Sequence, residues 1–156
     1  MKTITNLLAG ICLLYGTALT LAFSGDKPVY LTHPDAIDGA TLKNGSGDTF
    51  RVFAITPPIN AHDCVDDGGP VDCERKAAAM LELFAASFLK CEDMGTFDGS
   101  PALRCRDYQG RDIGARMVLM GWAVPDRTVG DHYIFEEIEA EARGNGIWRR
   151  RVSAVD

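Results

Sequence analysis

Apolar and polar positions divide the chain into two parts. Residues Leu7 to Phe23 form an apolar run behind Lys2. From residue 36 onward, short segments rich in β-branched and aromatic residues are separated by turn residues, and longer segments carry apolar residues at helical spacing. We therefore expect an N-terminal targeting segment and one folded domain over residues 36–148, followed by a frayed tail over residues 149–156.

The apolar run is typical of a secretory signal peptide. Thr20 and Ala22 supply the small residues that a signal peptidase needs, so we expect a signal peptide over residues 1–22 that is cleaved near Ala22. An uncleaved membrane anchor is the alternative, because about 17 apolar residues lie at the lower limit for crossing a bilayer. Cleavage predicts a periplasmic or secreted protein, and only the anchor predicts contact with a membrane.

Two pairs of segments predict β-hairpins. β-Branched and aromatic residues between positions 36 and 55 flank the turn KNGSGD, and Pro57 and Pro58 end the second strand of this pair. Further along, KCEDM and ALRCR predict strands on either side of the turn TFDGSP. This second pairing places Cys91 opposite Cys105.

Three segments predict helices. The first spans residues 72–89 and is capped by Asp72, the second spans residues 112–120 and stops at Gly121, and the third spans residues 131–143. The residues expected to face the core are Ala77, Leu81, Phe84 and Phe88 in the first helix and Ile134, Ile138 and Ala142 in the third. Gly144 and Gly146 are expected to end the third helix, and Trp148 is expected to pack on the core. This order of elements predicts an α+β domain with a small barrel closed by helices.

The cysteines indicate disulfides. Cys12 lies in the signal segment, and the other four form an even set suited to an oxidising compartment. Four cysteines allow three pairings, of which sequence proximity favours Cys64 with Cys73 and Cys91 with Cys105. A zinc site is the alternative, but the chain has no Cys-x-x-Cys pair and its three histidines are scattered.

Charge narrows the choice of partners. The formal net charge is −6, and removal of residues 1–22 deletes one Lys and no acidic residue, which leaves −7. An acidic protein repels phosphate backbones, so this charge weighs against nucleic acid as a partner and against a DNA-binding module without catalysis.

Two charged clusters leave alternatives open. An acidic loop could hold a divalent ion, although a solvated loop closed by a disulfide is the commoner arrangement. A basic run near the C terminus could contact a partner, although three charges beside a frayed end bind little alone. The loop residues are His62, Asp63, Asp66, Asp67 and Asp72, and the basic residues are Arg149, Arg150 and Arg151.

Five further motifs occur in a specific order and spacing between Ile37 and Trp148. They read IDGAT, FRVFAITPP, CERKAAAMLELF, GRDIGARMVLMGWAV and EAEARGNGIW. Together they resemble the staphylococcal nuclease family, also described as thermonuclease-like or SNase-like, and its secreted bacterial members with paired cysteines are especially similar. The resemblance implies an OB-fold, a five-stranded β-barrel flanked by three helices.

In active members of that family, the first motif is Asp-Gly-Asp-Thr, and the second is an Arg followed by four mostly apolar residues and Asp-x-Pro-Glu. The resemblance places the two calcium-binding Asp residues at Ala40 and Thr56 and the Glu that activates water at Ile59. The second phosphate-clamping Arg falls at Ser100. Arg51 is the one family equivalent that this chain keeps.

These substitutions predict a pseudoenzyme. Calcium needs six to eight oxygen ligands with carboxylates among them, and phosphoryl transfer depends on cations placed around the phosphate. We therefore expect no catalytic residue, no metal and no cofactor in a secreted thermonuclease-like domain that has lost nuclease activity. It would act as a binding or accessory protein in the cell envelope, with an envelope protein or a polysaccharide as partner and exopolysaccharide biosynthesis as a candidate role.

An active secreted nuclease is the alternative function. It would be a calcium-dependent phosphodiesterase that recruits Asp38, Asp48 or the acidic loop as substitute ligands. For Arg51, we favour a structural role in an ion pair with a nearby acid, such as Asp38, over the role of a phosphate clamp.

Overall fold

The computed structural model describes residues 27–58, 65–66, 69–70 and 72–149. The described chain is a mixed α+β fold with a six-stranded sheet and three α-helices. None of the helices within these ranges is both long enough and apolar enough to cross a bilayer. Several expectations fall outside these ranges, namely the signal segment, Ile59, the loop residues His62, Asp63, Cys64 and Asp67, and Arg150 and Arg151.

The main sheet has the strand order β1-β8-β9-β4-β3-β2, in which β4 and β9 are parallel and all other neighbours are antiparallel. The strands β1 and β2 lie at opposite ends, and no pairing between them is found among the described residues, so the closed five-stranded barrel stays a prediction. The strands are β1 Val29–Thr32, β2 Asp35–Ala36, β3 Thr41–Lys43, β4 Thr49–Val52, β8 Phe88–Phe97 and β9 Ser100–Arg106. Two short pairs join β5 Ile55–Thr56 to β10 Val124–Pro125 and β6 Val65–Asp66 to β7 Gly69–Pro70.

Both predicted hairpins are present. In the first, Asn44 Oδ1 accepts hydrogen bonds from the backbone N–H groups of Ser46 and Asp48, which closes the loop between β3 and β4. In the second, Cys91 and Cys105 face each other in β8 and β9 and form the expected disulfide, with their Cα atoms 4.0 Å apart. Cys73 is also disulfide-bonded, and its expected partner Cys64 lies outside the described residues.

Helix α1 spans Cys73–Ala85 and begins where the sequence predicts, because Asp72 Oδ1 accepts a hydrogen bond from the backbone N–H of Arg75 at 3.1 Å. The predicted inward residues Ala77, Leu81 and Phe84 are buried. Phe88 was expected to continue this stripe, and that expectation is wrong. The helix ends at Ala85 and β8 begins at Phe88, so strand alternation buries Leu89 and leaves Phe88 exposed.

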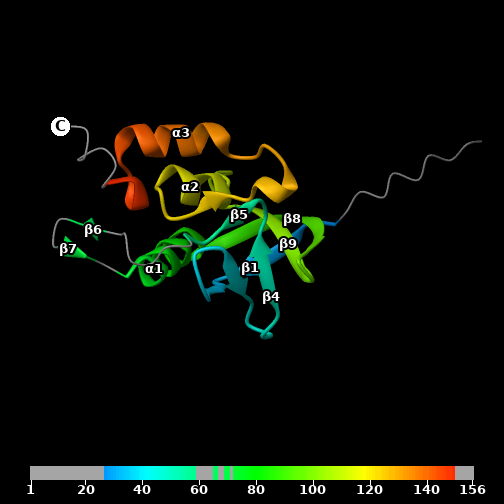
Figure 1. Cartoon of the computed structure of the whole chain (residues 1–156). Helices are drawn as coiled ribbons and strands as arrows, with labels where there is room; N and C mark the ends of the chain where they lie inside the picture. Colours follow the sequence, from blue (N-terminus) through cyan, green and yellow to red (C-terminus); the bar gives the residue numbers. More distant parts are fainter. Residues whose placement is uncertain (1–26, 59–64, 67–68, 71, 150–156) are drawn as a thin grey trace, which may run out of the picture.

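Helix α2 spans Ile113–Leu119 and lies between the sheet and helix α3, which spans Ile134–Arg143 (Figure 1). Asp112, predicted as the first residue of this helix, instead caps it by accepting a hydrogen bond from the backbone N–H of Ala115. Gly121 follows the end of the helix with φ +70°, as the sequence predicts. Two short 3-10 helices, η1 Arg127–Val129 and η2 Gly146–Trp148, flank α3, and Trp148 is buried as expected.

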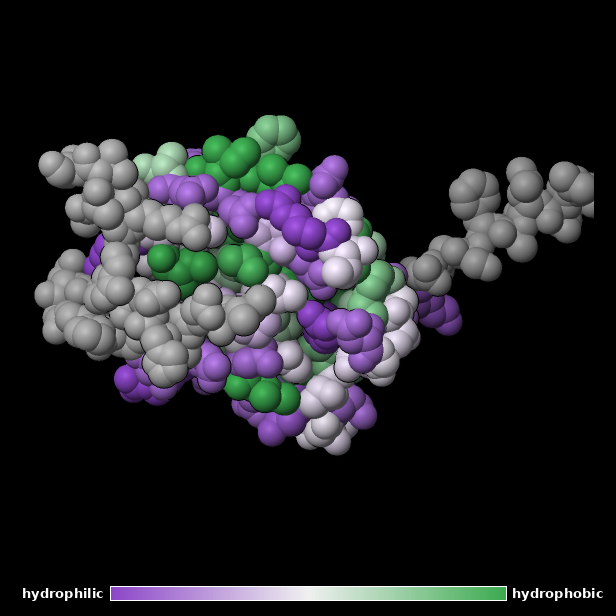
Figure 2. Space-filling view, viewed as in Figure 1, coloured by the Kyte–Doolittle hydropathy of each residue, from purple (hydrophilic) through white to green (hydrophobic). Residues whose placement is uncertain are grey.

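The predicted inward face of α3 is wrong at two of its three residues, because Ile134 is partly buried but the other two are not. Ile138 is 57% exposed and Ala142 is also exposed, whereas Ala140 is the buried residue of the helix. Glu137, one turn earlier, forms an ion pair with Arg127 of η1, which turns this acidic side toward the rest of the molecule. Phe135, 84% exposed, lies on the outside of α3, and Figure 2 shows apolar surface at the top of the molecule, where α3 lies in Figure 1.

The main core lies between the sheet, α1 and α2. Its largest fully buried side chains are Leu42, Ile55, Leu81, Leu89, Ile113, Met117 and Val118. β1 precedes residue 36, the expected start of the domain, and adds the buried Leu31 to this core. At the loop before β3, Gly39 lies so close to α1 that a Cβ atom on it would be 2.7 Å from Ala77 Cβ.

Candidate functional site

An open cavity of about 310 Å³ lies where β3, β4 and the start of β9 meet. It brings together four positions that the sequence singles out, namely Asp38, Ala40, Arg51 and Ser100. Thr56 is partly buried in β5 and does not line this cavity, and Ile59 lies outside the described residues. The complete lining is Asp38, Ala40, Thr41, Thr49, Phe50, Arg51, Pro57 and Ser100.

The pairing of β4 with β9 explains why these residues meet. Arg51 in β4 lies opposite Ala102 in the parallel strand β9, and Thr41 in β3 lies opposite Arg51 on the other side. Arg51 therefore lies in a central strand, with Ser100 at the start of the neighbouring strand. Hydroxyl groups of Thr41, Thr49 and Ser100 supply much of the polar character of the lining.

Asp38 holds the turn that leads into β3. Its Oδ1 accepts a hydrogen bond from the backbone N–H of Ala40 at 2.7 Å, and its Oδ2 accepts one from the hydroxyl of Thr41 at 3.0 Å. Both carboxylate oxygens thus accept hydrogen bonds from the same turn, one from a backbone N–H group and one from a hydroxyl. The expectation that Asp38 pairs with Arg51 is wrong, because these turn contacts hold the carboxylate on its own segment.

Two other acids pair with Arg51. Its Nη1 lies 2.8 Å from Asp98 Oδ2, and its Nη2 lies 3.8 Å from Asp126 Oδ2. The Arg51 side chain is only 22% exposed and that of Asp126 11%, whereas Asp98 is 81% exposed, so solvent screens the pair with Asp98 more strongly. The expectation of an ion pair at Arg51 is confirmed, with different partners from the one named.

Asp126 is held in its charged form. Hydrogen bonds from the hydroxyl and the backbone N–H of Thr128 lower the pKa of this carboxyl against the opposing effect of burial, and the Arg51 charge lowers it further. The same bonds cap η1. Asp126 is therefore a fixed anion next to Arg51.

The residues present do not fit the calcium site that the resemblance implies. Ala40 is fully buried and has no side-chain oxygen, and Thr56 offers a neutral hydroxyl in place of a carboxylate. No group of three or more His, Cys, Asp or Glu side chains suited to a metal ion occurs among the described residues. Around Arg51, one guanidinium faces Asp98 and Asp126, so the surroundings disfavour a phosphate.

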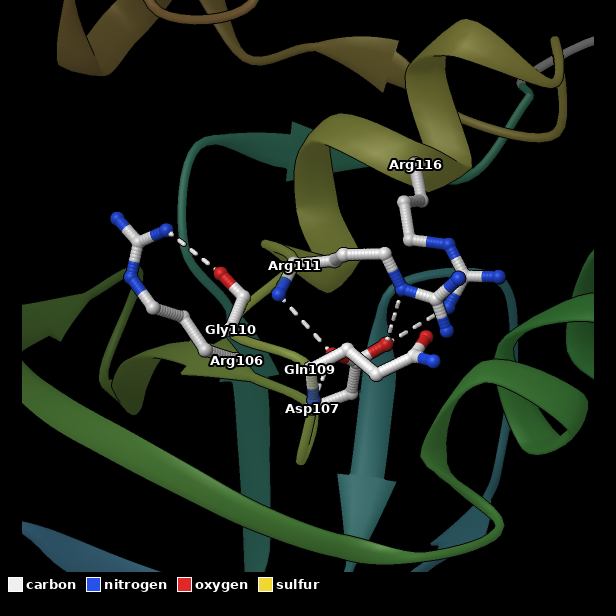
Figure 3. A network of polar contacts seen from close by, with 6 residues as sticks. All are labelled: Arg106, Asp107, Gln109, Gly110, Arg111 and Arg116. Atoms are coloured by element: carbon white, nitrogen blue, oxygen red, sulfur yellow. Dashed lines mark hydrogen bonds and ion pairs between the residues drawn. The ribbon is translucent and has the colours of Figure 1, made fainter.

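A second polar cluster lies between the end of β9 and α2 (Figure 3). Asp107 is buried, and its carboxylate accepts hydrogen bonds from the side chains of Arg111 and Arg116 at 2.7 and 3.2 Å and from the backbone N–H groups of Gln109 and Arg111. Burial raises the pKa of Asp107, but these hydrogen bonds outweigh it, so the pKa lies below its ordinary value.

This cluster stabilises the fold. Arg116 also places its guanidinium 3.8 Å from the ring centre of Phe84, which joins α2 to α1. Asp107 thus has a charged or backbone donor on each oxygen, and the contacts account for its burial. We therefore assign the candidate site to the cavity at Arg51 and not to Asp107.

Tyr133 forms a further buried contact beside α2. Its hydroxyl donates to Asp112 Oδ2 at 3.1 Å, and burial, together with the charge of Asp112, raises its pKa. His132 packs edge-on against Phe53, and the Arg104 guanidinium lies over the Phe53 ring at 4.8 Å from its centre. These contacts fix the segment before α3.

Comparison with models of known protein families and with curated proteins found no match. The assignment of a function therefore depends on the geometry at Arg51 and on the motif pattern of the sequence. Asp98 and Asp126 were not predicted as partners of Arg51 from the sequence. The Asp-Gly pair in TFDGSP signals a tight turn, but nothing local indicates that this turn lies beside β4.

Proposed function

We propose that this chain is a secreted or periplasmic thermonuclease-like domain, built on an SNase-like OB-fold, that has lost calcium-dependent nuclease activity. It acts as a binding or accessory protein in the cell envelope, where its partner is an envelope protein or a polysaccharide. The order of strands and helices supports the fold assignment, since the sheet strands, α1, the β8–β9 hairpin, α2 and α3 follow one another as the motif pattern implies.

The pairing of Arg51 with Asp98 and Asp126 is the observation that carries the proposal. A phosphodiesterase needs cations that are available to the phosphate in the transition state. Here the cation that the family motif keeps is already bound by two carboxylates of the same chain. Ala40 and Thr56 leave no acidic pair to bring a calcium ion to the cavity.

The cavity gives little support to the alternative function, an active nuclease with substitute metal ligands. Asp38 is the acid that lines it, and both of its oxygens already accept hydrogen bonds from Ala40 and Thr41. A calcium ion at Asp38 would have to replace the bond from Thr41 or share its oxygens.

A cleavage assay tests the proposal. The protein is incubated with single-stranded DNA during a calcium titration, with and without chelator, and Arg51→Ala is compared with Arg106→Ala, an exposed arginine of the same charge. We expect no cleavage by any of the three proteins. Calcium-dependent cleavage by the unchanged chain that Arg51→Ala abolishes and Arg106→Ala leaves intact would show that the chain is an active nuclease.

A further inference from the structure

Asp98 lies in a two-residue turn between β8 and β9. Asp98 and Gly99 both have positive φ angles, 49° and 77°, as expected for the tight hairpin turn that Asp-Gly sequences favour. The turn places Asp98 Oδ2 2.8 Å from Arg51 Nη1, although the two residues are 47 positions apart in the chain. The Asp98 side chain is 81% exposed and the Arg51 side chain only 22%. An exposed carboxylate therefore occupies one donor of a largely buried guanidinium.

We propose that Asp98 is the specificity-determining residue of the cavity, and that it excludes phosphate and other anions by taking the position on Arg51 that a ligand oxyanion would take. Ligands without negative charge are those that the cavity accepts. This inference rests on the proposed function, in which the domain binds a partner and does not cleave a phosphodiester, and it adds that the cavity takes part in that binding.

The geometry distinguishes Asp98 from the other acid at Arg51. Asp126 is tied to Thr128, its side chain is only 11% exposed, and it lies 3.8 Å from the guanidinium. Asp98 is closer to Arg51, and within the described part of the chain its carboxylate has no other hydrogen-bond partner. Arg51 lines the cavity and Asp98 does not, so loss of the Asp98 carboxylate frees a donor on a residue of the lining.

The lining can complete an anion site once that donor is free. Ser100 begins β9 directly after the Asp98–Gly99 turn, and Thr41 lies opposite Arg51 in the sheet. Both residues line the cavity, but the Thr41 hydroxyl already donates to Asp38, so Ser100 supplies the hydroxyl donor of this pair. Guanidinium and hydroxyl donors together suit a phosphate oxygen.

Titration of the full chain with inorganic phosphate, in the presence of chelator, tests the inference. Phosphate binding is measured by ³¹P NMR or calorimetry. The key variant is Asp98→Asn, because asparagine tolerates positive φ and preserves the turn while it removes the charge. Glu92→Gln is the matched control, since it removes one exposed acid from the same hairpin and lies at β8, opposite Arg104. The double variant Arg51→Ala with Asp98→Asn tests the need for the guanidinium, and thermal unfolding checks that every variant is folded.

We expect no binding by the unchanged chain or by Glu92→Gln at millimolar phosphate, and binding by Asp98→Asn that is at least about tenfold tighter because one close like charge is removed. The double variant should lose this gain. Equal binding by the unchanged chain and Asp98→Asn, an equal gain in Glu92→Gln, or a gain that survives in the double variant would overturn the inference. This test is independent of the cleavage assay. If the unchanged chain cleaves no DNA and Asp98→Asn binds no phosphate, the proposed function stands and only the role of Asp98 is refuted.

Discussion

At the scale of single residues, Asp107 is the buried charged residue of the described chain. A buried carboxylate is stable only when donors surround it, and Arg111 and Arg116 provide these at 2.7 and 3.2 Å. The pair of arginines also ties the turn after β9 to α2 (Figure 3). Asp107 therefore connects the end of the sheet to α2 through its ion pairs with Arg111 and Arg116.

Asp107→Asn should lower the free energy of unfolding near neutral pH by about 2 kcal/mol, the size of hydrogen bonds to a charged group. Because the folded pKa of Asp107 lies below its ordinary value, the ionised form adds stability that is complete above a pH of about 4 and decreases as the pH falls through the folded pKa. Urea unfolding of both proteins between neutral and acid pH measures this difference, which should shrink at low pH.

Glu92→Gln is the control for this prediction, since Glu92 is exposed and the charge change is the same. Its unfolding free energy should stay within about 0.5 kcal/mol of the unchanged chain. A stability loss in Asp107→Asn that persists undiminished at acid pH would contradict the role of the ionised carboxylate.

Residues with local partners were predictable from the sequence, and residues with distant partners were not. Asp72 and Asp112 cap helices through N–H groups three positions later, so their roles follow from the local sequence. Arg51 shows the opposite case, because its partners are 47 and 75 positions away. A single sequence shows that an acid is needed there, but not which acid the fold supplies.

At the scale of elements, the contact between the loop before β3 and α1 depends on one missing side chain. A Cβ atom on Gly39 would lie 2.7 Å from Ala77 Cβ and 3.2 Å from the carbonyl oxygen of Trp122. Both distances are too short, and one partner is backbone. Helix α1 therefore packs against this loop only because residue 39 is glycine.

Gly39→Ala should destabilise the protein by about 1 to 3 kcal/mol, because the added methyl group overpacks this contact. Gly45→Ala is the matched control in the β3–β4 loop, where nothing lies within 4 Å of the added atom. Chemical unfolding of the two variants side by side measures the effect. Equal stability of both variants would mean that the loop moves away from α1 without loss.

Helices α1 and α3 show where a sequence pattern predicts the buried face of a helix and where it does not. The stripe of α1 was predictable over Ala77, Leu81 and Phe84, since helical spacing and burial agree there. The stripe of α3 was not, because an ion pair between Glu137 and Arg127 and the small size of Ala140 decide which side faces α2. Periodicity shows that an apolar face exists, but tertiary contacts decide whether that face is buried.

At the scale of the whole molecule, the sheet begins before the domain boundary that the sequence suggested. β1 pairs along its full length with β8, from Val29 opposite Cys91 to Thr32 opposite Phe88. Leu31 contributes to the main core. The strand has only four residues, and the sequence pattern predicted that the domain begins at residue 36, so this strand was not predicted.

A chain that begins at Lys27 should therefore be more stable than one that begins at Ala36, by about 2 to 5 kcal/mol, the range for loss of a buried leucine side chain. The shorter chain also leaves the backbone groups of β8 without a partner along one edge. Unfolding by urea, with the disulfides intact, compares the two chains. The prediction fails if removal of β1 leaves the midpoint unchanged.

The parallel pairing of β4 with β9 limits the order in which the strands can fold during synthesis. Arg51 and Ala102 pair although they are 51 positions apart, so the first hairpin emerges from the ribosome long before the strand that covers its open side. Long-range pairings of this kind form slowly, and an uncovered strand invites association with other chains. Nascent fragments that stop short of β9 should therefore aggregate more readily than the full chain and depend more on chaperones.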